Sequence, residues 1–235
     1  MRTWPVLIPA ILAVAADTPR PLPTAREGLQ PLNVLIGTWK GTGYPEGVSK
    51  EERAAGMWTE SVTWGWAFKD QDSWLTVRFV KSKHFDTGEL RFSTSPSAPF
   101  QLTLTTPEKK THRYSGQLSD KTLTLTRTNG PPGEEQRLVF SLLHHNRHLY
   151  RIETRPAGSP LAFNKTFQVG ATKEGVLFAN VPKGPECVVS GGQGTTKVSY
   201  MGKDYFVCCS GCRDEFKANP AKYVEEWERK AKNEK

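Results

Sequence analysis

The middle of the chain alternates apolar and polar residues in short runs, which is the pattern of half-buried β-strands. In Trp74–Val80, for example, Leu75, Val77 and Phe79 would share one face of a strand. Gly, Pro and Asn separate the runs, as in Asn129–Gly133, and helical periodicity is weak. Further runs of this kind are Phe100–Thr105, Leu118–Thr128, Arg137–Leu143 and His148–Glu153. The pattern predicts an antiparallel β-barrel or β-sandwich.

The start of the chain predicts a targeting signal followed by a spacer. The apolar run Val6–Val14 is too short for a membrane helix, which needs about twenty residues, and Ala13-Val14-Ala15 fits a signal-peptidase site. We therefore expect a signal peptide over 1–15 and a secreted or periplasmic mature protein. Residues 16–30 are rich in proline and are predicted to form an extended or disordered leader. No later segment is apolar for long enough to span a membrane.

The segment that opens the β-rich region carries a more specific signal. Leu32–Gly43 contains Gly-Thr-Trp-Lys-Gly-Thr-Gly and resembles the Gly-x-Trp start of lipocalin-like and nitrobindin-like barrels. In those families the tryptophan, here Trp39, lies across the closed end of the barrel on the first strand. The glycines would let that strand coil sharply. The resemblance predicts a lipocalin-like β-barrel over 31–182, with an ordinary β-sandwich as the alternative.

The middle of the chain offers little catalytic chemistry. The chain has neither a Gly-x-Ser-x-Gly elbow, a phosphate-binding loop nor a His-Glu-x-x-His motif. The five histidines are interpreted as exposed loop residues, which disfavours both a haem ligand and a histidine metal clamp near one hairpin. These histidines are His84, His112, His144, His145 and His148. We predict that the protein is not an enzyme, and that the barrel at most binds a small hydrophobic ligand.

All the cysteines lie in the last part of the chain, behind a proline-rich linker at Pro182–Pro185. A domain boundary is therefore predicted near Val181–Pro185, followed by a small cysteine-containing domain over 183–235. The cysteines are Cys187, Cys208, Cys209 and Cys212.

The small domain has a recognisable order of elements. Lys197–Tyr200 and Asp204–Val207 predict a β-hairpin, Arg213–Ala218 a helix, and Pro220 the first residue of a second helix. A unit of about fifty residues has too little core to be comfortably stable alone. A metal ion held by thiolates would stabilise it, because the free energy of metal binding then contributes to folding.

The cysteine spacing and its surroundings resemble the TRASH/YHS-type metal-binding domain. The matching stretches are Glu186–Ser190, Val198–Cys212 and Phe216–Tyr223. The resemblance implies a treble-clef-like α+β fold and a metal ligand set of Cys187, Cys208 and Cys212, with Cys209 as a fourth ligand or a bystander. Members of the family handle copper, zinc and other soft metals. Related zinc ribbons have a fourth cysteine where Ser190 stands, and an open fourth position suits a labile or soft metal.

Two other interpretations of the cysteines remain open at this stage. In an oxidising compartment they could form two disulfides. Alternatively, Cys209 and Cys212 form a Cys-x-x-Cys between a strand and a helix, which would suit a thiol-disulfide oxidoreductase. That enzyme class, however, is built on a βαβ unit, which one hairpin and two helices do not provide.

The charge of the chain does not change this interpretation. Lys and Arg number 32 against 24 Asp and Glu, which gives a net charge of +8. The basic residues are spread along the chain and form no cluster of the kind that binds nucleic acid. The sequence thus predicts a mainly β protein with a lipocalin-like barrel and a small cysteine module. Its predicted role is that of an exported zinc- or copper-binding protein. The alternative is a barrel that binds a hydrophobic ligand, with a purely structural module.

Overall fold

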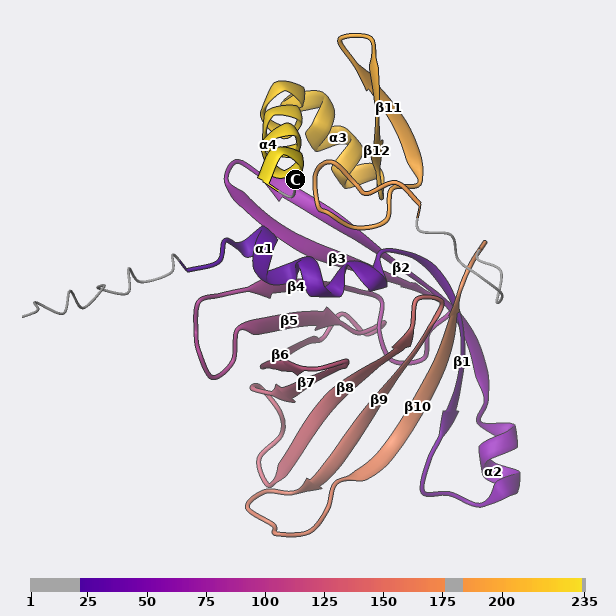
Figure 1. Ribbon diagram of the computed structural model, residues 1–235. Helices are drawn as coiled ribbons and strands as arrows, with labels where there is room; N and C mark the ends of the chain where they lie inside the picture. Colours follow the sequence, from indigo (N-terminus) through magenta and orange to yellow (C-terminus); the bar gives the residue numbers. More distant parts are fainter. Residues whose placement is uncertain (1–21, 176–183, 234–235) are drawn as a thin grey trace, which may run out of the picture.

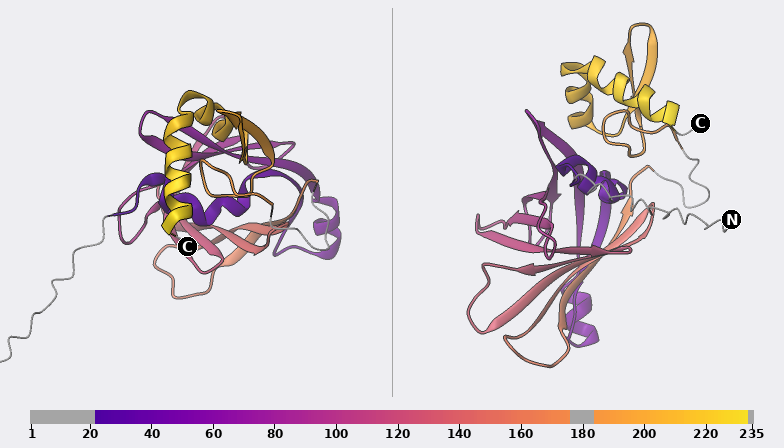
Figure 2. Two further views of the ribbon diagram at one scale, coloured as in Figure 1. Left: turned by 45° about the horizontal axis from the view of Figure 1, so that its top comes forward. Right: turned by 60° about the vertical axis from the view of Figure 1, so that its left-hand side comes forward.

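The computed structural model describes residues 22–175 and 184–233. The predicted signal peptide over 1–15 lies outside these residues, as do residues 181–183 of the predicted domain boundary. The described chain forms a large β-barrel, with a smaller module of a hairpin and two helices at one end (Figures 1 and 2). Within the described part of the chain, no helix is both long enough and apolar enough to cross a membrane.

The barrel is a closed sheet of ten antiparallel strands. Each strand pairs with its neighbours along the chain, and β1 pairs with both β2 and β10, which closes the sheet. The antiparallel barrel predicted from the alternating pattern is therefore confirmed, and the alternative of a sandwich is wrong. The strands are β1 (Gly37–Pro45), β2 (Trp58–Lys69), β3 (Asp72–Val80), β4 (Thr87–Phe92), β5 (Phe100–Thr105), β6 (Thr111–Ser119), β7 (Thr122–Arg127), β8 (Glu134–His144), β9 (Arg147–Pro156) and β10 (Asn164–Lys173).

Short helices precede the barrel and interrupt it: α1 (Ala25–Leu29), the 3-10 helix η1 (Gln30–Leu35) and α2 (Lys50–Ala55). The prediction of an extended leader over 16–30 is wrong for α1. Thr24 Oγ1 accepts a hydrogen bond from the Glu27 amide, and the Glu27 carboxylate accepts one from the Thr24 amide, which together form a capping box. The helices also bury apolar side chains completely, namely Leu29, Leu32 and Leu35.

Trp39 lies at the end of the barrel that η1 covers. Its side chain is fully buried, and its indole Nε1 donates a hydrogen bond of 2.7 Å to the Leu35 carbonyl oxygen. This position matches the one that the barrel resemblance predicted for Trp39. Farther along the same strand, a Cβ on Gly43 would lie 2.2 Å from the Trp58 ring, so glycine is required there for close packing of the ring.

His148 does not behave as an exposed loop residue. It is 1% exposed and packs edge-on against Trp39, with ring centroids 4.4 Å apart. Burial, together with the charge of Lys173, lowers the pKa of His148 to about 3, so the ring is neutral at pH 7. His84 is also partly buried, and its ring stacks on Phe167 with centroids 3.8 Å apart. The interpretation of the histidines as exposed loop residues is therefore wrong for both of them.

The C-terminal module contains β11 (Thr196–Tyr200), β12 (Lys203–Val207), α3 (Ser210–Ala218) and α4 (Pro220–Asn233). The predicted hairpin is present, and both residues of its two-residue turn have positive φ (Met201 +49°, Gly202 +77°), as a type I′ turn requires. Helix α3 begins at Ser210, three residues earlier than predicted. Phe216 and Tyr223, from the two helices, are both buried in the core of the module.

Candidate metal centre

The sulfur atoms of Cys187, Cys208 and Cys212 all lie within 4.8 Å of one another. Cys187 and Cys212 are fully buried, and Cys208 is 9% exposed. Cys187 lies in a loop before the hairpin, Cys208 directly follows β12, and Cys212 lies in the first turn of α3. The structure therefore brings together the three cysteines that the spacing and the family resemblance singled out as ligands. None of the four cysteines forms a disulfide.

Local hydrogen bonds shape the segment that carries Cys187, residues 187–192, which we call the Cys187 loop. The Cys187 amide donates to the Gly192 carbonyl at 2.6 Å, and the Gly191 amide donates to the Cys187 carbonyl at 2.9 Å. Gly191 has a φ of +74°, a conformation that glycine adopts readily. The Val188 amide donates to the Phe206 carbonyl at 2.9 Å and so ties the loop to β12.

Ser190 occupies the place where related zinc ribbons have a fourth cysteine. Its side chain is fully buried, and its hydroxyl oxygen lies 3.4 Å from the sulfur of Cys208. Its amide donates a hydrogen bond of 3.5 Å to the sulfur of Cys187. The site thus presents three sulfurs and one hydroxyl.

The pKa values of the three cysteines are shifted by their mutual contacts and by burial. Hydrogen bonds from Cys208 and Cys212 lower the pKa of Cys187. The bond to Cys187 raises the pKa of Cys208, and burial strongly raises the pKa of Cys212. Cysteine binds a metal as the thiolate, so a cation at this cluster would favour loss of the remaining thiol protons.

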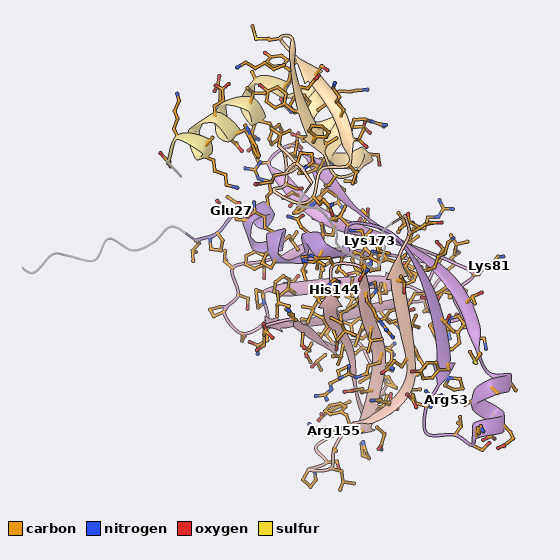
Figure 3. The ribbon with its side chains drawn as sticks, turned by 45° about the vertical axis from the view of Figure 1, so that its right-hand side comes forward. Glu27, Arg53, Lys81, His144, Arg155 and Lys173 are labelled. Atoms are coloured by element: carbon orange, nitrogen blue, oxygen red, sulfur yellow. The ribbon has the colours of Figure 1, made fainter. Side chains whose placement is uncertain are left out.

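The distances are also compatible with a metal. Zn–S bonds of about 2.3 Å place two thiolates of a tetrahedral site about 3.8 Å apart. The sulfurs of Cys208 and Cys212 lie 3.5 Å apart, close to that value. A basic side chain of the barrel lies near this cluster, and burial lowers the pKa of that side chain, Lys173. Figure 3 shows Lys173 at the end of the barrel that faces the module.

Cys209 stands apart from the three buried sulfurs. Its sulfur lies 3.8 Å from that of Cys208 but does not belong to the group whose members are all within 4.8 Å. The backbone amide of Trp66, on strand β2, donates a hydrogen bond of 3.3 Å to this sulfur. Hydrogen bonds from Cys208 and Cys212 lower the pKa of Cys209. Of the two predicted roles for Cys209, this geometry favours that of a neighbour over that of a ligand.

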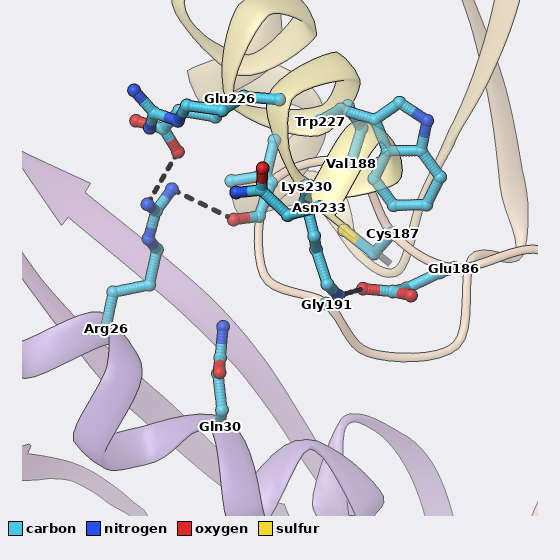
Figure 4. A pocket seen from close by; sticks show the side chains of 12 residues that line it. Arg26, Gln30, Glu186, Cys187, Val188, Gly191, Glu226, Trp227, Lys230 and Asn233 are labelled. Carbon is cyan, nitrogen blue, oxygen red and sulfur yellow. Dashed lines mark hydrogen bonds and ion pairs between the residues drawn. The ribbon is translucent and has the colours of Figure 1, made fainter. Parts of the chain in front are cut away.

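A pocket of about 390 Å³ lies next to the Cys187 loop, between α1 and α4, and Cys187 contributes to its lining. Figure 4 shows Arg26 and Gln30 on one side of this pocket, with Cys187, Val188 and α4 on the other. Two ion pairs of 2.7 Å cross its rim, Arg26 with Glu226 and Lys230 with Glu186.

Two barrel residues near the centre were not identified from the sequence. Asn33 contacts Ser190 through its side chain, and Trp66 contacts Cys209 through its backbone amide. Each pair is separated by more than 140 residues along the chain. The only signal at Asn33 is that one amide interrupts the apolar run Leu32–Ile36. Trp66 carries no signal beyond its place in an alternating strand. Sequence periodicity identifies which residues face a core but not which distant segment covers them.

One comparison with known proteins bears on the C-terminal module. The family model of the YHS domain matches residues 192–227, which include Cys208, Cys209 and Cys212. No curated protein matches the chain. Among solved structures, the chain is similar to one titled "Crystal Structure of Rv2717c from M. tuberculosis", with 15% identity and a TM-score of 0.37 over 63% of this chain and 97% of that chain. That likeness carries no argument. The C-terminal module is a YHS-type domain, as its cysteine spacing predicted.

Proposed function

We propose that this protein is an exported metal-binding protein that holds a copper or zinc ion through Cys187, Cys208 and Cys212. The observation that carries the proposal is the convergence of three buried sulfurs within 4.8 Å of one another, with no disulfide among them. The YHS-type domain is compatible with this role. Thiolates are soft ligands, which favour Cu(I) and Zn(II) over Mg²⁺ or Ca²⁺.

The chain's own residues would do three things at this site. The cysteines supply the charge and the bonds, and their burial keeps bulk water away from the metal. The Ser190 amide donates to the Cys187 sulfur, which would stabilise its thiolate form. The Ser190 hydroxyl fills the space that a fourth cysteine would occupy without adding a charge. These features suit binding rather than catalysis.

Elemental analysis combined with thiol titration of the purified full chain under reducing conditions tests the proposal. We expect one zinc or copper ion per chain and reactive thiols that become accessible only after a strong chelator is added. Cys212→Ser should abolish metal binding, whereas the matched variant Cys209→Ser should retain it. Reduced protein that takes up neither Zn(II) nor Cu(I) would contradict the proposal.

The same titration separates the two alternative functions. A reversible Cys209–Cys212 disulfide in metal-free protein would favour an oxidoreductase, although Cys212 is fully buried. Binding of a hydrophobic ligand by the barrel has less support, because large side chains such as Trp64 and Tyr150 are fully buried there. The barrel interior also holds a buried carboxylate, Glu60, which accepts hydrogen bonds from Tyr150 and from Trp58.

Export is the part of the proposal that depends on sequence alone. The predicted signal peptide motivates it, and N-terminal sequencing of the protein from its native host is the direct test. We expect a mature chain that starts near Ala16, and an intact Met1 on secreted material would contradict this.

A further inference from the structure

The Cys187 loop is held from outside the module, by a side chain of the barrel's first segment. Asn33, in η1, donates from its side-chain amide to the Ser190 carbonyl at 2.9 Å. The oxygen of the same side chain accepts a hydrogen bond of 2.9 Å from the indole Nε1 of Trp66. Asn33 therefore connects strand β2 to the loop that carries the first cysteine.

A second route joins the same two parts on the other side of the metal centre. The backbone amide of Trp66 donates to the Cys209 sulfur at 3.3 Å, and Cys209 directly follows Cys208. The barrel and the module are thus joined by a connected series of hydrogen bonds. Ser190 bonds to the Cys187 sulfur through its amide and to Asn33 through its carbonyl. Trp66 then bonds to Asn33 through its indole and to the Cys209 sulfur through its backbone amide.

Close backbone packing accompanies these hydrogen bonds. A Cβ on Gly192, the last residue of the Cys187 loop, would lie 3.0 Å from Cγ of Asn33. A Cβ on Gly211, in α3, would lie 1.7 Å from the Trp66 carbonyl oxygen. Two glycines of the module therefore sit where any larger residue would push the barrel away.

Arg26 provides a third tie to the same loop. Its guanidinium donates to the Val189 carbonyl at 3.2 Å and pairs with Glu226 of α4 at 2.7 Å. Two successive carbonyl groups of the Cys187 loop, those of Val189 and Ser190, are thus satisfied by barrel-side residues. Without these donors, partly buried carbonyl groups would lose their partners, and the loop would gain other conformations.

We propose that Asn33 is a positioning residue for the metal centre, so that barrel and module bind metal as one unit. The inference rests on the proposed function. Metal affinity falls in proportion to the fraction of molecules whose Cys187 loop is in the binding conformation, and Asn33 keeps that fraction high. By thermodynamic reciprocity, metal binding stabilises the contact between the module and the barrel.

The test is a Zn(II) competition titration of the full chain against a chromophoric chelator. Asn33→Ala should weaken Zn(II) binding about tenfold, which corresponds to a competent fraction of about one tenth. The matched control is Asn129→Ala. The side-chain amide of Asn129 also makes two hydrogen bonds, but within the barrel: it accepts from the Arg113 backbone amide at 2.7 Å and donates to the Thr111 carbonyl at 2.8 Å. This control should bind Zn(II) as the wild type does.

A second variant guards against a general folding defect. Gly192→Ala keeps every hydrogen-bonding group of Asn33 and displaces that side chain from the module side, so it should weaken Zn(II) binding as well. Both changes act through the contact between Asn33 and Gly192. The Zn(II) affinity of the double variant should therefore be no lower than that of the single variant with the lower affinity. Circular dichroism should show the barrel intact in each variant.

The outcomes are distinguishable. Wild-type protein that binds Zn(II), with Asn33→Ala within twofold of it, overturns this inference and leaves the proposed function standing. Additive effects of Asn33→Ala and Gly192→Ala also overturn it. If the wild type binds Cu(I) and not Zn(II), the same variants are compared with Cu(I) under the same criteria. Wild-type protein that binds neither ion overturns the proposed function and this inference together.

Discussion

The barrel and the module differ in the side chains that fill their interiors. The barrel surrounds large aromatic side chains, of which Trp39, Trp64 and Tyr150 are among the largest that are fully buried. The module is much smaller, and its buried side chains are few: three cysteines, three valines, Ser190, Phe216 and Tyr223. Apolar area can stabilise the first core without help, whereas the second is too small for that and gains from a metal ion.

The stability of the barrel and the stability of the module should therefore depend on different interactions. The barrel should respond to changes in its packing and in the protonation of its buried side chains, and it should tolerate removal of metal. The module should respond to chelators, to changes at the sulfurs and to changes at its contact with β2. The predictions that follow test each side of this contrast.

The largest effect is expected at Trp39. Trp39→Ala removes a fully buried indole and its hydrogen bond to Leu35, and should lower the free energy of unfolding by about 3–5 kcal/mol. Denaturant unfolding followed by circular dichroism measures the change. Trp74→Ala, at a half-buried indole beside Arg91, should cost clearly less. Equal losses for the two variants would contradict the position given to Trp39.

Acid should destabilise the barrel through His148. The folded-state pKa of about 3 lies below the usual histidine pKa of 6.5, so the folded state favours the neutral ring. The unfolded chain therefore binds a proton below about pH 6.5, and stability falls as pH decreases from there toward 3. Between pH 7 and pH 4 the loss should be on the order of 3 kcal/mol. His148→Phe should flatten that part of the pH profile, and an unchanged profile would contradict the assignment.

The contact between β2 and α3 should be sensitive to a single methyl group. Gly211→Ala places a Cβ against the Trp66 carbonyl and should weaken the packing of the module on the barrel by about 1–3 kcal/mol. Thermal unfolding with and without Zn(II) measures this. Gly65→Ala, next to Trp66, is a suitable control because its Cβ would meet only Thr76 Oγ1, at an ordinary 3.8 Å. A harmless Gly211→Ala would show that the module does not pack against β2.

The smallest predicted effect concerns the fourth ligand position. Ser190→Cys would place a fourth sulfur beside Cys208 and should tighten Zn(II) binding about tenfold, or about 1.4 kcal/mol, and slow its exchange. Ser190→Ala is the control and should change the affinity much less. Competition titration measures both variants. Unchanged binding by Ser190→Cys would place the metal away from Ser190.

Parts of the fold that depend on local pattern could be predicted from the sequence. Alternation along Trp74–Val80 and its counterparts indicated the strands, and Lys197–Tyr200 with Asp204–Val207 indicated the hairpin. The cysteine spacing and its family resemblance indicated the sulfur cluster. Both signals are local in the sequence, because each depends on a few consecutive residues or on one small domain.

Features that depend on long-range contacts could not be predicted in this way. The burial of His148 depends on Trp39, more than one hundred residues earlier in the chain, and a strand pattern does not show which of its faces a distant ring will cover. The helix at Ala25–Leu29 was missed because nearby prolines suggested an extended leader, although Thr24 and Glu27 form a recognisable capping box. The contacts of Asn33 likewise exist only once the module is in place.

X-ray absorption spectroscopy of the zinc-loaded full chain tests the central claim most directly, because it counts the sulfur atoms bound to the metal. The account predicts three sulfurs at about 2.3 Å and one lighter ligand, with the same spectrum for Cys209→Ser. Four sulfurs in the wild type that fall to three in Cys209→Ser would contradict the role given to Cys209, and a metal without sulfur ligands would contradict the site itself.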